Sequence, residues 1–125
     1  MKSSLCVVTL WAENVPETVA FYRDIIGLEL MPHHGPDRVH LKMGENLYLV
    51  ILKGKPSPAT ETTIERFPVV AFRVNDLDEA IAELNSKGVD LPPKIEEDAV
   101  SRWVFIHDPG GNLIEIAEFV KTPFA

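Results

Sequence analysis

VVTLWAENVPETVAFYRDI, residues 7–25, aligns over its whole length with VVAFRVNDLDEAIAELNSK, residues 69–87. Each stretch begins with strand-like apolar residues and continues into a helical pattern whose apolar positions follow i, i+4, i+7 spacing. These positions are Val15, Val19 and Tyr22 in the first stretch and Leu77, Ile81 and Leu84 in the second. Because a repeat on this scale sets the architecture, the chain is predicted to contain the same supersecondary unit twice.

Local signals predict where each helix begins and ends. Asn14 and Asp76 are residues of the N-cap type, and each is followed three residues later by a glutamate, as in a capping box. Gly27 and Gly88 are expected to take the left-handed conformation that ends a helix. Both stretches therefore predict the order strand, cap, helix.

Four strands are expected in each half of the chain. Gly44-Glu45-Asn46-Leu47 matches Gly110-Gly111-Asn112-Leu113, and both are turns that lead into a last strand. The expected strands are residues 5–11, 28–34, 37–43 and 46–53, then 68–74, 89–91 with 94–97, 101–107 and 112–119. The chain is thus one domain of two βαβββ modules, about 4–53 and about 67–119, with a linker at about 54–66 and a tail at 120–125. Two modules are needed because one alone leaves a face of its sheet bare.

Composition and charge restrict the partners. The chain has 125 residues, of which 46% are hydrophobic, and 12 Lys and Arg stand against 19 Asp and Glu for a formal net charge of −7. This acidity disfavours nucleic acid and anionic membranes, which both bind clustered Lys and Arg, and is compatible with a neutral or cationic small ligand. A single cysteine, no long apolar run and no cleavable leader lead us to expect a cytoplasmic protein.

Three strings carry a resemblance to a known family: FYRDIIGLEL at 21–30, FRVNDLDEAIAELNSKGVDL at 72–91 and HDPGGNLIEI at 107–116. With the repeat, they resemble the vicinal oxygen chelate (VOC) superfamily of glyoxalases, fosfomycin and bleomycin resistance proteins, dioxygenases and methylmalonyl-CoA epimerase. The resemblance covers about Leu5 to Phe119. It implies an α+β fold of two tandem βαβββ modules with cup-shaped mixed sheets, and a homodimer in which modules pair within one chain or are swapped between two.

The resemblance also implies where a metal would bind. Enzymes of this superfamily commonly use a His or similar residue on the first strand of each module and a Glu on the last strand of each. These positions align with Val7, Val69, Leu49 and Glu115. Valine and leucine have no lone pair, and one carboxylate is a poor site for zinc, nickel or iron. We therefore expect no metal and no other cofactor.

Other metal-ligating and nucleophilic residues do not repair this set. His33 and His34 are neighbours near the end of a strand, so their side chains point to opposite faces and at most one of them converges with His40. These histidines are interpreted as surface residues, with two alternatives: a displaced metal site built from them, or a base role for His33 or His40 near the mouth of a cavity. Cys6 falls on the helix-facing side of its strand and is interpreted as a small core residue.

Strand alternation assigns one face of the modules to a ligand. Its predicted residues are Val7, Thr9, Trp11, Leu49, Val69, Arg73 and Glu115. Such an apolar face with few polar groups is typical of a small-molecule site, although a layer buried in a dimer has the same composition. Trp11 is either an edge aromatic or a platform for a planar ligand.

Glu115 is the candidate catalytic or ligand-contacting residue. A carboxylate among apolar residues is either paired or has a raised pKa, and Arg73 lies on the matching face as a structural partner. Two functions stay open. One is a metal-independent small-molecule-binding protein resembling the bleomycin resistance type. The other is a metal-dependent glyoxalase-like lyase or isomerase, or a dioxygenase, that acts on a small oxygenated substrate with a metal held unconventionally or with Glu115 as the base. A fold retained as a structural module is the third alternative.

Overall fold

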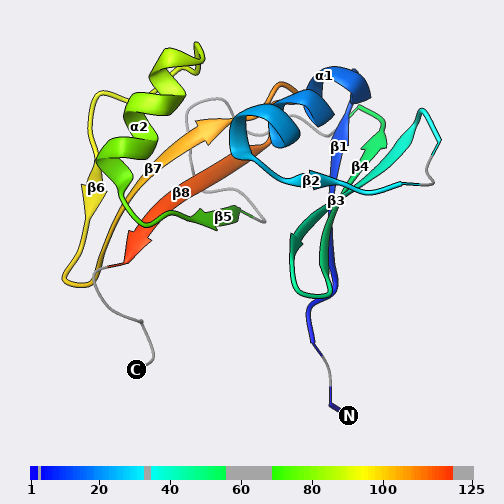
Figure 1. Ribbon diagram of the computed structural model, residues 1–125, viewed down its shortest axis with the longest axis horizontal. Helices are drawn as coiled ribbons and strands as arrows, with labels where there is room; N and C mark the ends of the chain where they lie inside the picture. The colour runs from blue at the N-terminus through cyan, green and yellow to red at the C-terminus, as the bar shows by residue number, and fades with distance from the viewer. Residues whose placement is uncertain (3, 33–34, 56–68, 120–125) are drawn as a thin grey trace. The chain divides into compact units, whose positions relative to one another are not determined.

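The computed structural model describes residues 1–2, 4–32, 35–55 and 69–119 (Figure 1). Its contacts define two compact units, Met1–Pro58 with Asp108–Asn112, and Ala59–His107 with Leu113–Ala125. The predicted tail and most of the predicted linker lie outside the described residues. Each unit holds one four-stranded sheet, which confirms the α+β class and the two βαβββ modules.

The sheet of the first unit has the strand order β1–β4–β3–β2. Its strands are β1 (Val7–Ala12), β2 (Glu29–Leu30), β3 (Arg38–Gly44) and β4 (Leu47–Lys53). β1 runs parallel to β4, and the other pairs are antiparallel. The chain passes from β1 to β2 through α1 (Val15–Ala20) and one π-helical segment, η1 (Phe21–Ile26).

The second unit repeats this topology with the strand order β5–β8–β7–β6. Its elements are β5 (Val70–Arg73), α2 (Leu77–Ser86), β6 (Glu96–Glu97), β7 (Ser101–His107) and β8 (Leu113–Phe119). Figure 1 shows α2 lying along one face of this sheet. The predicted strands agree closely with those observed, and the largest difference is the shortness of β2 and β6.

The helix ends follow the predicted capping. The Asn14 side chain accepts a hydrogen bond of 3.0 Å from the Glu17 N–H, and the Asp76 side chain accepts one of 3.1 Å from the Glu79 N–H. Gly27 has φ +91° at the end of η1, and Gly88 has φ +78° after α2. A glycine adopts this left-handed conformation without the steric cost that a Cβ adds.

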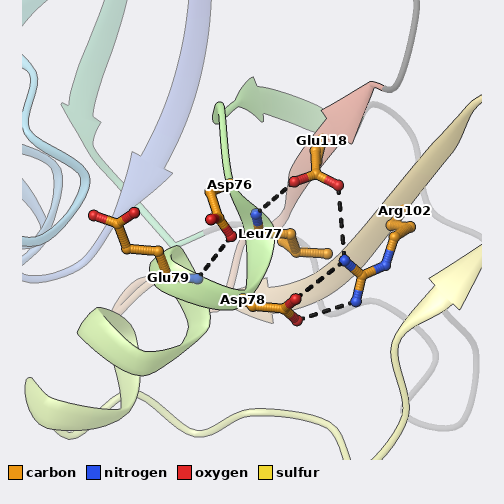
Figure 2. Close-up of polar contacts among 6 residues, drawn as sticks. All are labelled: Asp76, Leu77, Asp78, Glu79, Arg102 and Glu118. Atoms are coloured by element: carbon orange, nitrogen blue, oxygen red, sulfur yellow. Dashed lines mark hydrogen bonds and ion pairs between the residues drawn. The ribbon is translucent and has the colours of Figure 1, made fainter.

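A second set of polar contacts fixes the start of α2 on its own sheet (Figure 2). A Glu118 oxygen on β8 accepts a hydrogen bond of 3.1 Å from the Leu77 N–H. Arg102 on β7 lies 3.7 Å from the other Glu118 oxygen and 3.1 Å from Asp78. The side chains of Glu118 and Arg102 thus anchor the first turn of α2 to the two central strands, on the face opposite the candidate site.

The core of each unit lies between the sheet and its helix. In the first unit, Leu10, Val39, Leu41, Leu49 and Ile51 are buried on the face that α1 covers. In the second, Val70, Val104, Ile106, Ile114 and Ile116 are buried on the α2 side. The opposite face of each sheet is the one that its own helix leaves uncovered.

The turn Asp108–Asn112 follows β7 in sequence but belongs by its contacts to the first unit. The Tyr22 hydroxyl donates a hydrogen bond of 2.6 Å to the Asp108 carboxylate, and both side chains are buried. Asn112 donates to Asp108 through its backbone N–H at 2.9 Å and to the Trp11 carbonyl through its side-chain amide at 3.0 Å. Burial and the neighbouring Asp108 raise the pKa of Tyr22 far above its ordinary value, so the hydroxyl stays a donor.

Two predicted positions are wrong. Leu49 is fully buried on the helix-covered face, because it pairs with Val8 rather than standing beside Val7. The alignment of the two turns is one residue out of step with the strand pairing, in which Val50 lies opposite Thr9 as Glu115 lies opposite Ala71. Such a one-residue shift moves a side chain to the other face of the sheet. Cys6 is exposed rather than buried, because it precedes the first residue of β1.

Candidate functional site

The open face of the second unit carries the predicted carboxylate. Register places Glu115 between Ala71 on β5 and Phe105 on β7. The next row along the sheet is Arg73, Ala117, Trp103 and Glu96, in that order across the four strands. Glu115 therefore lies at the centre of a sheet face, with aromatic side chains on the neighbouring strand.

Glu115 is half-buried, and burial raises the pKa of its carboxyl group above the ordinary value. Desolvation is the cause, since it penalises the charged form. Within the described ranges, no hydrogen bond or ion pair is made by the Glu115 carboxylate. A carboxylate partly removed from water without compensation is costly, and it is suited to a partner that the described residues do not supply.

The guanidinium group of Arg73 lies over an aromatic ring. Its guanidinium carbon lies 5.5 Å from the centroid of the Phe119 ring, within the range of a cation–π contact. Register places Arg73 opposite Ala117 and one row away from Glu115. The proposed Glu115–Arg73 ion pair is not among the contacts of the described residues, so the structural role considered for Glu115 loses its support.

The open face of the first unit holds the other predicted residues. Val7, Thr9 and Trp11 all point to this face and are exposed, with Trp11 at 46%. They pair with Tyr48, Val50 and Leu52 of β4, in that order. Val69 is half-buried and lies just before β5 in the second unit. The predicted ligand-binding residues other than Leu49 are thus divided between the first unit and the second.

The residues present do not fit the metal site of the superfamily. Thr9 and Val50 are paired as Ala71 and Glu115 are, so the position matching Glu115 is Val50 rather than Leu49. Valine has no lone pair for a metal, so this position offers no metal ligand whether it is Leu49 or Val50. Across the part of the chain that the structure describes, no three His, Cys, Asp or Glu side chains come together as a possible metal site. His33 and His34 lie outside the described residues.

The buried Tyr22–Asp108 hydrogen bond was not predicted from the sequence. Tyr22 shows only as an apolar helix position, and the Asp-Pro-Gly-Gly string only as a turn. A tyrosine on the buried side of a helix does indicate that its hydroxyl has a hydrogen-bond partner, because buried hydroxyls nearly always have one. Nothing local in the sequence indicates that this partner lies 86 positions away.

The fold and the two sheet faces define the class of protein. The profile of the Glyoxalase/Bleomycin resistance protein/Dioxygenase superfamily matches residues 5–116, and the chain belongs to this superfamily. None of the curated proteins compared with the chain matches it.

Solved structures of similar fold come from several bacteria. A fosfomycin resistance protein, FosX, from Listeria monocytogenes aligns with a TM-score of 0.76 and 22% identity over 98% of this chain and 94% of its own. Lactoylglutathione lyase from Agrobacterium tumefaciens aligns with a TM-score of 0.71 and 23% identity over 94% of each chain. An integron cassette protein from V. cholerae has a TM-score of 0.70 and 22% identity over 94% of this chain and 97% of its own. At these identities the likeness shows the fold alone.

No helix in the described parts of the chain is both long and apolar enough to pass through a membrane.

Proposed function

We propose that this member of the superfamily is a metal-independent small-molecule-binding protein whose site includes Glu115. The observation that carries the proposal is the half-buried carboxylate at the centre of an open sheet face, with no partner among the described residues. A ligand that donates a hydrogen bond or carries a positive charge provides the missing partner. Apolar lining with a few oriented polar groups is the usual composition of such sites.

The surroundings of Glu115 favour a planar ligand. Phe105 lies directly opposite Glu115 on β7, and Trp103 lies one row away on the same face. Aromatic side chains offer large apolar contact area to a flat molecule. Because the cation of Arg73 is held over Phe119, it is not paired with Glu115. The proposed ligand is therefore planar, with an amine, amidine or amide donor directed at Glu115.

A thermal-shift screen of planar amines, amidines and amides tests the proposal, with benzamidine as the first probe. Wild-type protein is expected to be stabilised by at least one such compound in the presence of a chelator, because binding to the folded state alone raises its stability. The variant Glu115→Gln should fold and lose most of this shift. The matched control Glu45→Gln removes an exposed charge from the β3–β4 turn and should retain it. A shift that survives Glu115→Gln unchanged contradicts the assignment, and a shift or a turnover that the chelator abolishes contradicts metal independence.

The proposal extends to the assembly. The superfamily resemblance leads us to propose a homodimer, since apolar side chains are exposed just before and at the start of β1, at Leu5 and Val7. Sedimentation velocity at micromolar concentration tests this part by itself, and a monomer there contradicts it.

A further inference from the structure

The open face of the first unit combines an exposed aromatic ring with basic side chains, in contrast to the acidity of the whole chain. Register aligns Trp11 of β1, Leu52 of β4 and Arg38 of β3 in one row across the sheet. The next row is Thr9, Val50 and His40, and the one after it is Val7, Tyr48 and Lys42. Three basic residues, Arg38, His40 and Lys42, thus occupy alternate positions of one strand and share a face.

The two ends of this basic strand differ. Lys42 pairs in register with Glu29 of β2, so an acidic residue lies beside it on the neighbouring strand. β2 ends at Leu30, so it provides no register partner for Arg38. Arg38 is exposed, and among the described residues no ion pair involves its side chain. The positive charge of this face is therefore concentrated at the Arg38 end, in the same row as Trp11.

Trp11 is held in place although it is exposed. A Cβ added to Gly54 would lie 2.6 Å from Cε3 of the indole, so the ring lies against the bare backbone of this glycine. The Gly54 N–H donates to the Ala12 carbonyl at 3.0 Å, and the Asn112 side chain donates to the Trp11 carbonyl at 3.0 Å. An exposed ring whose backbone and face are both fixed is preorganised for stacking, which reduces the entropy that binding costs.

We propose that the row of Trp11, Leu52 and Arg38 binds a planar organic anion. The ring of the ligand stacks on Trp11 and Leu52, and its carboxylate or other planar anionic group accepts hydrogen bonds from the Arg38 guanidinium. Adjacent strands lie about 4.8 Å apart, so the backbones of Trp11 and Arg38 are about 10 Å apart across β4. A fused two-ring acid is long enough to contact both side chains. This inference does not rest on the proposed function, which concerns the opposite charge and another sheet.

The test uses 2-naphthoate as the probe and its uncharged amide, 2-naphthamide, as the matched ligand. Binding is followed by quenching of Trp11 fluorescence in a Trp103→Phe background, where Trp11 is the one remaining tryptophan. The acid should bind more tightly than the amide. In Arg38→Gln its affinity should fall about two- to fivefold, the range expected for one exposed charge pair, and that of the amide should not change.

Two further variants separate charge from folding. Arg38→Lys retains the charge and should retain part of the preference for the acid, although it loses the two-pronged geometry of arginine. Lys94→Gln removes an equivalent exposed charge from the second unit and should leave both affinities unchanged. The proposal is overturned if acid and amide bind equally, if Arg38→Gln and Lys94→Gln have the same effect, or if Trp11 is not quenched because a second copy of the chain covers this face. Because benzamidine and Glu115→Gln report on the other proposal, each can fail without the other.

Discussion

Replacing Tyr22 with Phe removes one buried hydroxyl and leaves the packing of the ring unchanged. The hydroxyl donates to Asp108 at 2.6 Å, and Tyr22 and Asp108 have exposed fractions of 0% and 4%. A hydrogen bond to a charged group contributes about 1.5–3 kcal/mol, and loss of the donor leaves a buried carboxylate with one partner fewer. Asp108 keeps the Asn112 backbone and side-chain donors, which limits the loss. We expect Tyr22→Phe to lower the free energy of unfolding by about 1.5–3 kcal/mol.

Urea denaturation followed by circular dichroism measures this loss, and Tyr48→Phe is its control. Tyr48 is half-buried on the open face of the first unit, and its hydroxyl makes no hydrogen bond to the described residues. Tyr48→Phe should therefore change the unfolding free energy by less than about 0.5 kcal/mol. A double-mutant cycle with Asp108→Asn should give a coupling energy of about 1 kcal/mol or more. If Tyr22→Phe behaves like Tyr48→Phe, the buried hydrogen bond does not hold the turn to the first unit.

Three other predictions concern the caps, the tryptophan platform and the candidate carboxylate. Asp76→Ala removes the cap of α2 and should lower the free energy of unfolding by about 1 kcal/mol in the same urea assay. The control Glu83→Gln removes the exposed Glu83–Lys87 pair and should lower the free energy of unfolding by less. Gly54→Ala places a Cβ against the Trp11 ring, so the ring must move; the Trp11 emission of the Trp103→Phe background should shift, and an unchanged spectrum would contradict the contact. Burial raises the folded-state pKa of Glu115, so the folded wild type loses stability as pH rises from the unfolded-state pKa through the folded-state pKa. Glu115→Gln lacks this titration, so its free energy of unfolding relative to that of the wild type should be higher at pH 7 than at pH 4 in the urea assay.

What the sequence predicts well is local. The caps at Asn14 and Asp76 and the left-handed Gly27 depend on residues within one turn of each other, and all are observed. The repeat also predicts that both modules have the same succession of elements, a strand, a helix and three strands, and this is observed. The position of Glu115 on the open face follows from alternation within β8 and a regular β5–β8 ladder.

The errors arise where pairing between strands decides the outcome. Leu49 aligns with Glu115 when the two turns are matched in the sequence, but the strand pairing places Val50 in that position. Arg73 shares a face with Glu115, yet its cation lies over Phe119, because alternation gives the face of a side chain and not its direction along that face. The Tyr22–Asp108 hydrogen bond joins distant segments, so no local pattern predicts it.

The measurement that tests the central claim most directly is a carbon-13 NMR titration of the Glu115 carboxyl group in chelator-treated protein, with and without benzamidine. Burial without a partner predicts a pKa above the ordinary glutamate value in the free protein. A bound cation favours the charged form, so the pKa of Glu115 should fall when benzamidine is added. An ordinary pKa in the free protein, or no response to any planar cation that binds, would contradict the proposal that Glu115 is the group that pairs with the ligand.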